Sequence, residues 1–462
     1  MTAAIALDLG TTSVKSGLLT REGRLEQVIA LPAPEIVASG GYRESDALAY
    51  AAVAEQALGA SRAHAQGCVA LGLCSQRSSF LVWERDSGRP LTPLISWQDE
   101  RGAENCAELR AQELTIRDLS GLPLTPYYFA PKLRRVLRDH PEWQGCLERG
   151  ELLTGTLDTF LIWRWSGGRL HLTDASMAAR TQLLDIHRQE WSPALCAAFG
   201  IPPAILPRIV PSAGLELRLD NGLMLRASAG DQSAALFAAI GGEREALVNL
   251  GTGGFVLRPL AEALLPNVPT GYLRMLVYQD GAHQAHFAVE GTLNSIAAAL
   301  AEYPPEACRS GDLAADDDIY CLAEPSGLGA PYFRTDLGLR FSQPVTHLPR
   351  HRVAALLLEG IVFRVARILE DFHRASAIER VYLSGGLSEL ECLRQGIAAC
   401  VPFAVHRLHQ RESSLLGAAL LAAGMPPTAQ RDAEKVQVPG DHTLAEKYER
   451  WKVWLDGLLD KR

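Results

Sequence analysis

The sequence predicts an α/β protein built from two related halves with a cleft between them. The segment IALDLGTTSVKSGLL near the N-terminus and the segment LVNLGTGGFVL, which starts at Leu247, share one order of features: apolar strand, Gly/Thr turn, second strand. Asp8 and Asn249 occupy matching positions in these two segments. A further strand, turn and helix follow downstream in each half, as a duplicated core requires.

The first half begins with a meander of strands. Strands are expected at IALDLG, SVKSGLLT and REGRLEQVIALP, whereas a Rossmann or P-loop start places a helix after the first strand. An Ala-rich helix should run from about Asp46 to Ala65, and Cys68–Gln76 should form a strand buried on both faces. Between Gln98 and Leu206 helices alternate with Pro/Gly loops, which suggests a layer inserted into or appended to the first core.

The second half follows the segment LRASAGDQSAALFAAIGG. A long amphipathic helix is expected from about His351 to Ser376, and RVYLSGGLSEL should form a strand, a Gly-Gly turn and a helix. The charged tail from Asp432 should form a helix docked on the surface. We therefore predict an N-terminal domain over residues 1–240, a C-terminal domain over 241–430 and a helical tail over 431–462.

Composition narrows the class of protein. With 462 residues the chain can form two or three domains, each with its own core. Its net charge of −8 argues against nucleic acid or an anionic membrane as the main partner, and no apolar run reaches the ~18 residues of a membrane span. Nine cysteines without a C-x-x-C pair favour reduced thiols in the cytoplasm over zinc or iron–sulfur binding.

The two Gly/Thr turns are candidate phosphate-binding loops. Backbone amides of such turns, with the threonine hydroxyls, can donate to phosphate oxygens, so GTT at 10–12 and GTGG at 251–254 could hold a polyphosphate from two sides. Lys15 could add positive charge, and the carboxylate of Asp8 suits Mg²⁺. A plain hairpin explains either turn taken alone.

Asp231 is the candidate for acid–base chemistry. The segment ASAGDQSAAL leads from small residues through Gly230 to Asp231 and Gln232 at the start of an Ala-rich helix. Asp231 could simply cap that helix, or it could act as a general base that accepts the proton of an alcohol. Phosphoryl transfer suits the second role, because it depends on positioning, metal and charge neutralisation more than on covalent chemistry.

A third group of residues could recognise a small polyhydroxy molecule. Arg77 follows a buried strand, Trp97 and Asp99 lie in ISWQDERG, and Tyr127 lies in TPYYFAPK. Arginine, aspartate and tyrosine side chains pair well with neighbouring hydroxyls, and an indole face packs on a carbon skeleton. A core or interface position would equally explain Trp97, and a surface salt bridge would explain Arg77.

Taken together, these segments resemble the FGGY family of carbohydrate kinases, and within it most closely the glycerol kinases. The resemblance covers nearly the whole chain in the expected order, through ALDLGTTSVK, CSQRSSFLVWERDSGRPLTPLISWQDER, DTFLIWRWSGGRLHLTDASMAARTQLLDI, AGDQSAALF, NLGTGGFVL, GLGAPYF, LLLEGIVFR, LSGGLSE and SSLLGAALLA. It implies a duplicated ribonuclease-H-like, actin-like fold that closes over ATP and a substrate. The N-terminal domain would carry the substrate side, the first phosphate loop and the catalytic loop, and the C-terminal domain the nucleotide side.

The resemblance also implies roles for individual residues. Asp231 would be the catalytic base, and Asp8 and Asp231 would hold Mg²⁺. Residues expected to contact the acceptor are Gln76, Arg77, Ser78, Trp97, Asp99, Tyr127, Asp231, Gln232 and Phe255. Residues expected to contact the nucleotide are Thr11, Thr12, Lys15, Gly251, Thr252, Gly385 and Gly386. ATP and Mg²⁺ are the expected cofactors and a small polyol or sugar the expected partner, with a homodimer as an open option.

Departures from the family pattern bear on the substrate. Ser78 stands where glycerol kinases have a glutamate, which removes a carboxylate that accepts hydrogen bonds from substrate hydroxyls and leaves room for a larger polyol or a ketose. The sequence thus predicts ATP-dependent phosphorylation of a small polyol or ketose. The alternatives are a glycerol kinase proper and, from another class, an actin- or chaperone-like ATPase without a small-molecule acceptor. Gln76-Arg77, Trp97 and Tyr127 favour a kinase.

Overall fold

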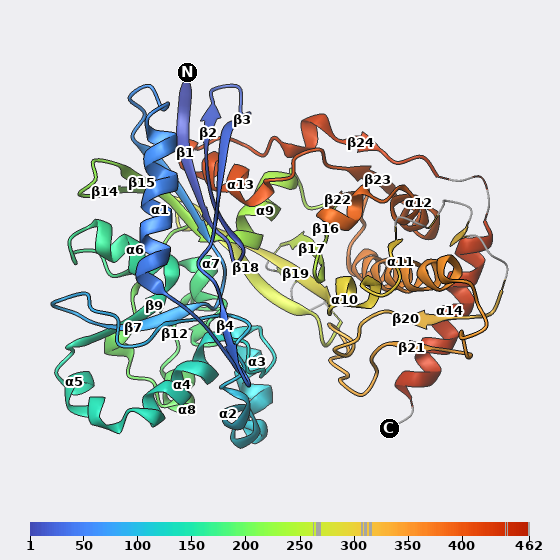
Figure 1. The fold of residues 1–462 in the computed structure, drawn as a ribbon, viewed down its shortest axis with the longest axis horizontal. Helices are drawn as coiled ribbons and strands as arrows, with labels where there is room; N and C mark the ends of the chain where they lie inside the picture. The colour runs from blue at the N-terminus through green and yellow to red at the C-terminus, as the bar shows by residue number, and fades with distance from the viewer. Residues whose placement is uncertain are drawn as a thin grey trace. The chain divides into compact units, whose positions relative to one another are not determined.

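The computed structural model describes residues 1–261, 263–264, 269–305, 308, 312–313, 317–438, 440 and 442–460. The chain divides into two compact units, each with its own β-sheet and helices (Figure 1). Unit 1 comprises Met1–Ala238, Met275–Phe287 and Glu412–Thr428. Unit 2 comprises Ala239–Arg274, Ala288–Arg411 and Ala429–Arg462. The domain boundaries near residues 240 and 430 stay a prediction.

A six-stranded sheet in the order β14-β15-β6-β1-β2-β3 forms the centre of unit 1. Its strands are β1 (Thr2–Leu9), β2 (Ser13–Thr20), β3 (Leu25–Pro32), β6 (Ala70–Ser75), β14 (Ala213–Arg218) and β15 (Met224–Gly230). The first three pair antiparallel, which confirms the predicted meander. Burial on both faces, predicted for the β6 segment, is confirmed from Leu71 to Ser75, whereas Val69 before it is exposed.

The parallel strands of this sheet end at one edge. β6 pairs in parallel with both β1 and β15, and the register places Leu9 beside Ser75 and Ser75 beside Gly230. Each of these residues is the last of its strand. The segments that follow the three strands therefore leave the sheet side by side, although the sequence separates them widely.

Two helices with small residues pack on this sheet. α1 (Ala47–Arg62) starts at Asp46, whose carboxylate accepts the N–H groups of Leu48 and Ala49, and it confirms the helix expected there. α13 (Ser413–Ala423), drawn in red beside the blue N-terminal strands in Figure 1, contacts β1, β6 and β15. A Cβ atom at Gly72 of β6 would lie 2.1 Å from the carbonyl oxygen of Ala418, so only glycine permits this approach.

Unit 1 also contains an additional layer, which the sequence predicts between Gln98 and Leu206, but four of the five strands of its sheet lie before Gln98. Its sheet has the order β4-β5-β8-β7-β9, with β4 (Val37–Ser39), β5 (Tyr42–Ser45), β7 (Phe80–Glu84), β8 (Leu94–Ile95) and β9 (Leu152–Thr156). Its helices are α2 (Ala103–Glu108), α3 (Glu113–Ser120), α4 (Phe129–Asp139), α5 (Gln144–Glu148), α6 (Leu157–Trp165), α7 (Ala175–Ala178) and α8 (Pro193–Phe199). Short strands complete it: β10 (Leu172–Asp174), β11 (Leu184–Asp185), β12 (Glu190–Trp191) and β13 (Arg208–Val210). Phe80, Phe129 and Phe199 belong to a hydrophobic core separate from that of the main sheet.

The seven-stranded sheet, whose strands lie mostly in unit 2, repeats the strand pairing of the first sheet. Its order is β18-β19-β17-β16-β22-β23-β24, with β16 (Glu245–Leu250), β17 (Gly254–Leu260), β18 (Leu273–Gln279), β19 (Ala285–Leu293), β22 (Arg380–Ser384), β23 (Ala404–Arg407) and β24 (Glu434–Lys435). β16 pairs antiparallel with β17 and parallel with β22, as β1 does with β2 and β6. β23 continues the parallel set and β24 closes it antiparallel, like β15 and β14. The predicted duplication is confirmed.

Helices complete unit 2. They are α10 (Ile296–Leu300), α11 (Arg350–Ala375), α12 (Glu391–Cys400) and α14 (Thr443–Leu459), with the short hairpin β20 (Cys321–Leu322) and β21 (Arg340–Phe341). α11 confirms the long helix expected there. Helix α9 (Asp231–Ala239) directly follows β15. Across the described part of the chain, none of the helices combines the length and apolar character that crossing a membrane requires.

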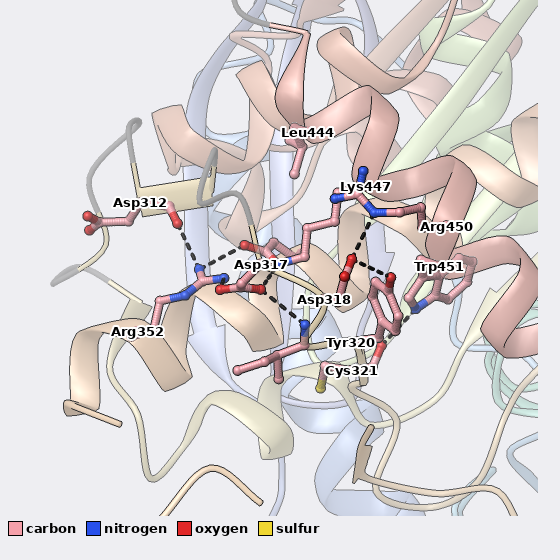
Figure 2. Close-up of polar contacts among 12 residues, drawn as sticks. Asp312, Asp317, Asp318, Tyr320, Cys321, Arg352, Leu444, Lys447, Arg450 and Trp451 are labelled. Carbon is pink, nitrogen blue, oxygen red and sulfur yellow. Dashed lines mark hydrogen bonds and ion pairs between the residues drawn. The ribbon is translucent and has the colours of Figure 1, made fainter. Parts of the chain in front are cut away.

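The tail helix α14 docks through one buried face, as expected, and exposes the other face at residues such as Val453. Trp451 is fully buried, and its indole N–H donates to the carbonyl oxygen of Cys321 at 3.0 Å (Figure 2). Lys447, also fully buried, forms ion pairs with Asp317 at 2.6 Å and Glu359 at 2.7 Å. Arg352 completes the group through Asp317. One face of the tail is therefore held against unit 2 by an apolar ring and a balanced set of charges.

Two helical glycines of unit 1 make a matched test of the close packing of α13. A Cβ atom at Gly417 in α13 would lie 1.8 Å from the carbonyl oxygen of Ala234, whereas one at Gly59 in α1 would meet nothing within 4 Å. We expect Gly417→Ala to lower the free energy of unfolding by about 1–3 kcal/mol, and Gly59→Ala to raise it by roughly 0.5–1 kcal/mol. Urea unfolding followed by circular dichroism measures both; equal effects of the two substitutions would contradict the close packing at Gly417.

Candidate active site

Asp8 lies at the carboxyl edge of the unit 1 sheet, as the second-last residue of β1. Its side chain is buried, with 7% exposed, and Ser414 at the start of α13 donates to Oδ2 at 2.6 Å. Burial raises the pKa of Asp8 to about 6 against the opposing effect of the Ser414 hydrogen bond, and the negative charge of Asp231 acts in the same direction as burial. Two carboxylates thus interact at this edge.

The chemistry at Asp8 fits a divalent cation. Within the described ranges, no N–H or O–H group donates to the buried Oδ1 of Asp8, whose neighbour is the thiol of Cys74. Among those residues no cluster of three or more His, Cys, Asp or Glu side chains could hold a metal. Mg²⁺ fits such a place, because it commonly uses one or two carboxylates and keeps waters and phosphate oxygens as its other ligands.

Lys15 faces Asp8 across the β1–β2 hairpin and forms an ion pair with Glu412. The two residues pair in register, and the Lys15 ammonium lies 2.5 Å from Oε2 of Glu412, with both side chains about one quarter exposed. Glu412 directly precedes α13, the helix that also carries Ser414. Sequence reasoning missed Glu412 and Ser414. The motif SSLLGAALLA was noted only as a family marker, and nothing local in it indicated contact with the first strands.

Gln76 and Trp97 form a polar wall beside the first phosphate turn. Gln76 follows β6 and accepts, through Oε1, hydrogen bonds from Ser79 at 2.9 Å and Thr11 at 3.2 Å. The indole N–H of Trp97 donates to the hydroxyl of Thr11 at 3.0 Å, while 40% of the Trp97 side chain remains exposed. The structure therefore brings together Thr11, Gln76 and Trp97, which the sequence analysis singled out in separate segments. Thr12, next to Thr11 in the turn, is exposed.

Asp231 is the first residue of α9 and borders this wall. Its Oδ1 accepts the backbone N–H of Gln232 at 2.7 Å and lies 3.5 Å from Nε of Arg77. The side chain of Asp231 is 28% exposed, against 9% for Arg77. A Cβ atom at Gly230 would lie 3.0 Å from the Arg77 side chain, so glycine lets the arginine pack against the start of α9. The carboxylate is held in place and still reaches solvent.

Lys132 in α4 ties together the turns that carry Ser78 and Trp97. Its ammonium nitrogen, fully buried, donates to the carbonyl oxygens of Ser78 at 3.0 Å and Ser96 at 2.8 Å. Burial lowers the pKa of Lys132 to about 7, while Asp99 opposes that shift and Arg101 adds to it. Sequence reasoning missed this residue, which looks like one more charge in the segment YYFAPKLRRVL.

Ser78, Asp99 and Tyr127 have neighbours that the sequence did not indicate. Ser78 has a left-handed backbone, φ +64, and its hydroxyl donates to the carbonyl oxygen of Arg180 at 3.1 Å. Asp99 has no exposed surface and accepts the N–H of Arg43 at 2.7 Å and the guanidinium of Arg101 at 2.8 Å. The exposed Tyr127 donates to Glu100 at 2.9 Å. Contact of these three residues with an acceptor stays a prediction.

Four of the residues expected to contact the nucleotide lie in unit 2. Gly251 and Thr252 form the turn between β16 and β17, and Gly385 and Gly386 follow β22. Gly385 has φ +86, and a Cβ atom there would lie 2.4 Å from the carbonyl oxygen of Leu250. The two glycine turns therefore touch, and glycine is required for that contact. Phe255 is on β17, opposite Asn249, at the position that Lys15 has in unit 1.

Two units of the same topology, each with a Gly/Thr turn at the tip of a hairpin, define a two-domain phosphotransferase class with an actin-like fold. The chain belongs to the FGGY family of carbohydrate kinases: its residues 3–227 match the N-terminal domain of that family and residues 246–425 the C-terminal domain. It is therefore a kinase of the class that phosphorylates hydroxyl groups of sugars and polyols with a nucleoside triphosphate.

Individual relatives agree with this assignment. The chain is 31% identical to a glycerol kinase of Methylibium petroleiphilum, over 98% of each chain. It is 30% identical to an apulose kinase of Pectobacterium atrosepticum, over 97% of each. Among solved structures it is similar to the Plasmodium falciparum glycerol kinase with ADP, with TM-score 0.87, 21% identity, and 99% of each chain covered. The predicted family, fold and enzyme class are confirmed, and the ATPase without a small-molecule acceptor is set aside.

The buried amine of Lys132 predicts a pH-dependent contribution to stability. Its pKa is about 7 in the folded chain against 10.5 ordinarily, so between these values the unfolded chain binds more protons and the free energy of unfolding rises with pH. Lys132→Met removes this pH-dependent contribution to the free energy of unfolding. We expect the stability difference, wild type minus variant, to grow from about pH 7 upward by at most about 1.4 kcal/mol per pH unit.

Urea unfolding at pH values of about 7, 8 and 9 measures that difference. The matched control is Lys435→Met, since Lys435 is exposed on β24 and should give a difference that does not change with pH. A Lys132→Met difference that stays constant over this range would show that the folded chain keeps Lys132 protonated.

Proposed function

We propose that the chain transfers the terminal phosphoryl group of ATP, with Mg²⁺, to a hydroxyl of a small polyol or ketose, and that Asp231 is the general base. The observation that supports it most is the common end of β1, β6 and β15. Because these strands stop in register, the phosphate turn after Leu9, the pair Gln76-Arg77 and Asp231 leave one edge together. Donor site, acceptor wall and base are then neighbours within unit 1.

Asp231 has the placement that a general base needs. A carboxylate at the start of a helix, partly exposed and oriented by Arg77 and by the Gln232 N–H, can take the proton of a hydroxyl brought within hydrogen-bond reach. Gln232 and Arg77 would contact the acceptor beside it. Closure around the substrate would exclude water, which otherwise competes as phosphoryl acceptor.

We assign the phosphate contacts to the Gly/Thr turns. Thr11, Thr12 and Lys15 would serve in unit 1, and Gly251, Thr252, Gly385 and Gly386 in unit 2. Asp8 and Asp231 would hold Mg²⁺, which supplies neutralisation of phosphate charge when bound. The ion pair of Lys15 with Glu412 keeps the ammonium beside this turn.

The acceptor would rest on Trp97 and contact Gln76, Tyr127 and, from unit 2, Phe255. Position 78 is a serine, so it offers no carboxylate to a small triol, and its hydroxyl donates to the Arg180 carbonyl oxygen. This supports an acceptor larger than glycerol. We propose that Asp99 acts indirectly, by fixing the turn after Trp97 through Arg43 and Arg101. Glycerol itself is the second candidate, supported by the glycerol kinases among the relatives.

We also propose that the chain works in the cytoplasm. All nine cysteines are free thiols in the structure, as suits a reducing compartment. Association into a homodimer stays a prediction.

Asp231→Asn tests the base directly. The amide keeps the size and the helix-start hydrogen bond but cannot accept a proton, so kcat should fall by ~10²-fold or more, with little change in unfolding midpoint. The control is Asp220→Asn, an exposed residue paired with Arg169, which should keep full activity. Near-normal turnover of Asp231→Asn, measured by coupled ADP release, would refute the assignment.

An acceptor screen tests the substrate class. ADP release is measured with glycerol, erythritol, pentitols, ketopentoses and ketohexoses, and we expect the highest kcat/KM for a molecule larger than glycerol. A clear preference for glycerol would make the second candidate correct. No stimulation by any of them would refute the polyol-or-ketose assignment.

A further inference from the structure

We infer that the first phosphate turn and the acceptor wall share one hydrogen-bonded circuit, in which Tyr50 and Ser79 are positioning residues. The inference rests on the proposed function and adds a coupling between nucleotide and acceptor binding. The circuit lies wholly within unit 1 and consists of Gly10, Thr11, Tyr50, Gln76, Ser79 and Trp97.

The direction of each hydrogen bond near Trp97 follows from the fact that both of its nitrogens can only donate. Both nitrogens of Trp97 can only donate: the indole N–H to Thr11 at 3.0 Å and the backbone N–H to Ser79 at 2.9 Å. Each hydroxyl, having accepted from Trp97, gives its single proton to Oε1 of Gln76, at 3.2 Å from Thr11 and 2.9 Å from Ser79. The amide oxygen of Gln76 therefore faces both hydroxyls.

The far end of the circuit is fixed in the same way. The hydroxyl of Tyr50 lies 2.5 Å from the carbonyl oxygen of Gly10, which can only accept, so Tyr50 donates there. Its oxygen is then the acceptor for the amide nitrogen of Gln76 at 3.0 Å. Tyr50 thus joins the backbone of the phosphate turn to the same glutamine that holds the Thr11 hydroxyl.

Burial makes the inner part of this circuit rigid. Tyr50, Gln76 and Ser79 are exposed by 1%, 3% and 0%, so water cannot replace a lost partner, and a polar group left unsatisfied there destabilises the folded chain. Trp97, in contrast, is 40% exposed. A change imposed on the Thr11 hydroxyl therefore reaches Trp97 directly through the indole N–H, and it reaches the buried Gln76 through Oε1.

The circuit limits what Thr11 can do for a phosphate. Its only proton is already given to Gln76, so its hydroxyl can donate to a phosphate oxygen only when that bond opens. Opening frees Oε1 of Gln76 to accept a hydrogen bond from an acceptor hydroxyl, and it changes the polar environment of the Trp97 indole. Nucleotide should thus strengthen acceptor binding, and by thermodynamic linkage the acceptor should strengthen nucleotide binding equally.

The first test uses Mg²⁺–ADP alone, because it needs no known acceptor. ADP binding is measured by calorimetry, and the contribution of Trp97 to the emission change is the difference between the wild type and Trp97→Phe. We expect Trp97 emission to change on ADP binding in the wild type and in Thr11→Ser, which keeps the hydroxyl. Thr11→Val and Tyr50→Phe should lose that change while still binding ADP.

The second test uses the best acceptor of the screen. Its KM should fall about tenfold between subsaturating and saturating ATP in the wild type, a value within the usual range of coupling, and should stay nearly constant in Tyr50→Phe. The control is Tyr448→Phe in unit 2, which also removes a buried tyrosine hydroxyl, bonded to Glu370 at 2.8 Å, and should keep the tenfold change.

The outcomes separate the two proposals. ADP binding without a Trp97 response, or a response and a KM change that survive in Tyr50→Phe, would overturn the circuit and leave the kinase assignment intact. Loss of the KM change in Tyr448→Phe as well would reduce Tyr50 to a structural residue and also overturn it. Absence of ADP binding in calorimetry would refute the proposed function, and the coupling with it.

Discussion

The hydrogen-bonded ladder that holds β1, β6 and β15 in parallel register is the constraint on which the site depends. Parallel strands in register present their carboxyl ends at one edge, so the segments after Leu9, Ser75 and Gly230 must meet there. The ladder leaves room for α13 only because Gly72 has no side chain, and Gly417 lets α13 approach Ala234 of α9. That helix then contributes Ser414 to Asp8, and Glu412 just before it contributes to Lys15. A site of four segments thus follows from one alignment.

Much of this arrangement could be predicted from sequence because its signals are local. Gly/Thr turns between apolar strands, the small residues before Asp231 and the amphipathic period of α11 each indicate an element without knowledge of its neighbours. Glu412 and Ser414 could not be predicted, since their partners lie some four hundred residues away along the chain. Burial of Asp99 and Lys132 depends on side-chain partners in other elements, and periodicity carries no information about them.

Comparison of the two halves shows where the repeat has diverged. The hairpins have equivalent registers, yet Asn249 replaces Asp8 and Phe255 replaces Lys15. Unit 2 keeps the backbone of a phosphate turn, with Gly385 closing against Leu250, but not the ionisable pair. Identical topology therefore supports one turn equipped with charges and one that offers backbone donors and an aromatic ring. Charge chemistry is concentrated in unit 1.

The pairing of Lys15 with Glu412 has a consequence for selectivity. In the resting molecule the ammonium beside the first Gly/Thr turn already has a carboxylate 2.5 Å away. Asp231 has Arg77 beside it, and Asp8 adds a further negative charge. A free phosphate or a metal-free nucleotide approaching this edge meets net repulsion instead of an open cationic cradle. A polyphosphate that arrives with its divalent cation reverses that balance, because the cation satisfies the carboxylates. Under the proposed function, the turn would therefore discriminate by the charge of the whole complex and not by phosphate affinity alone.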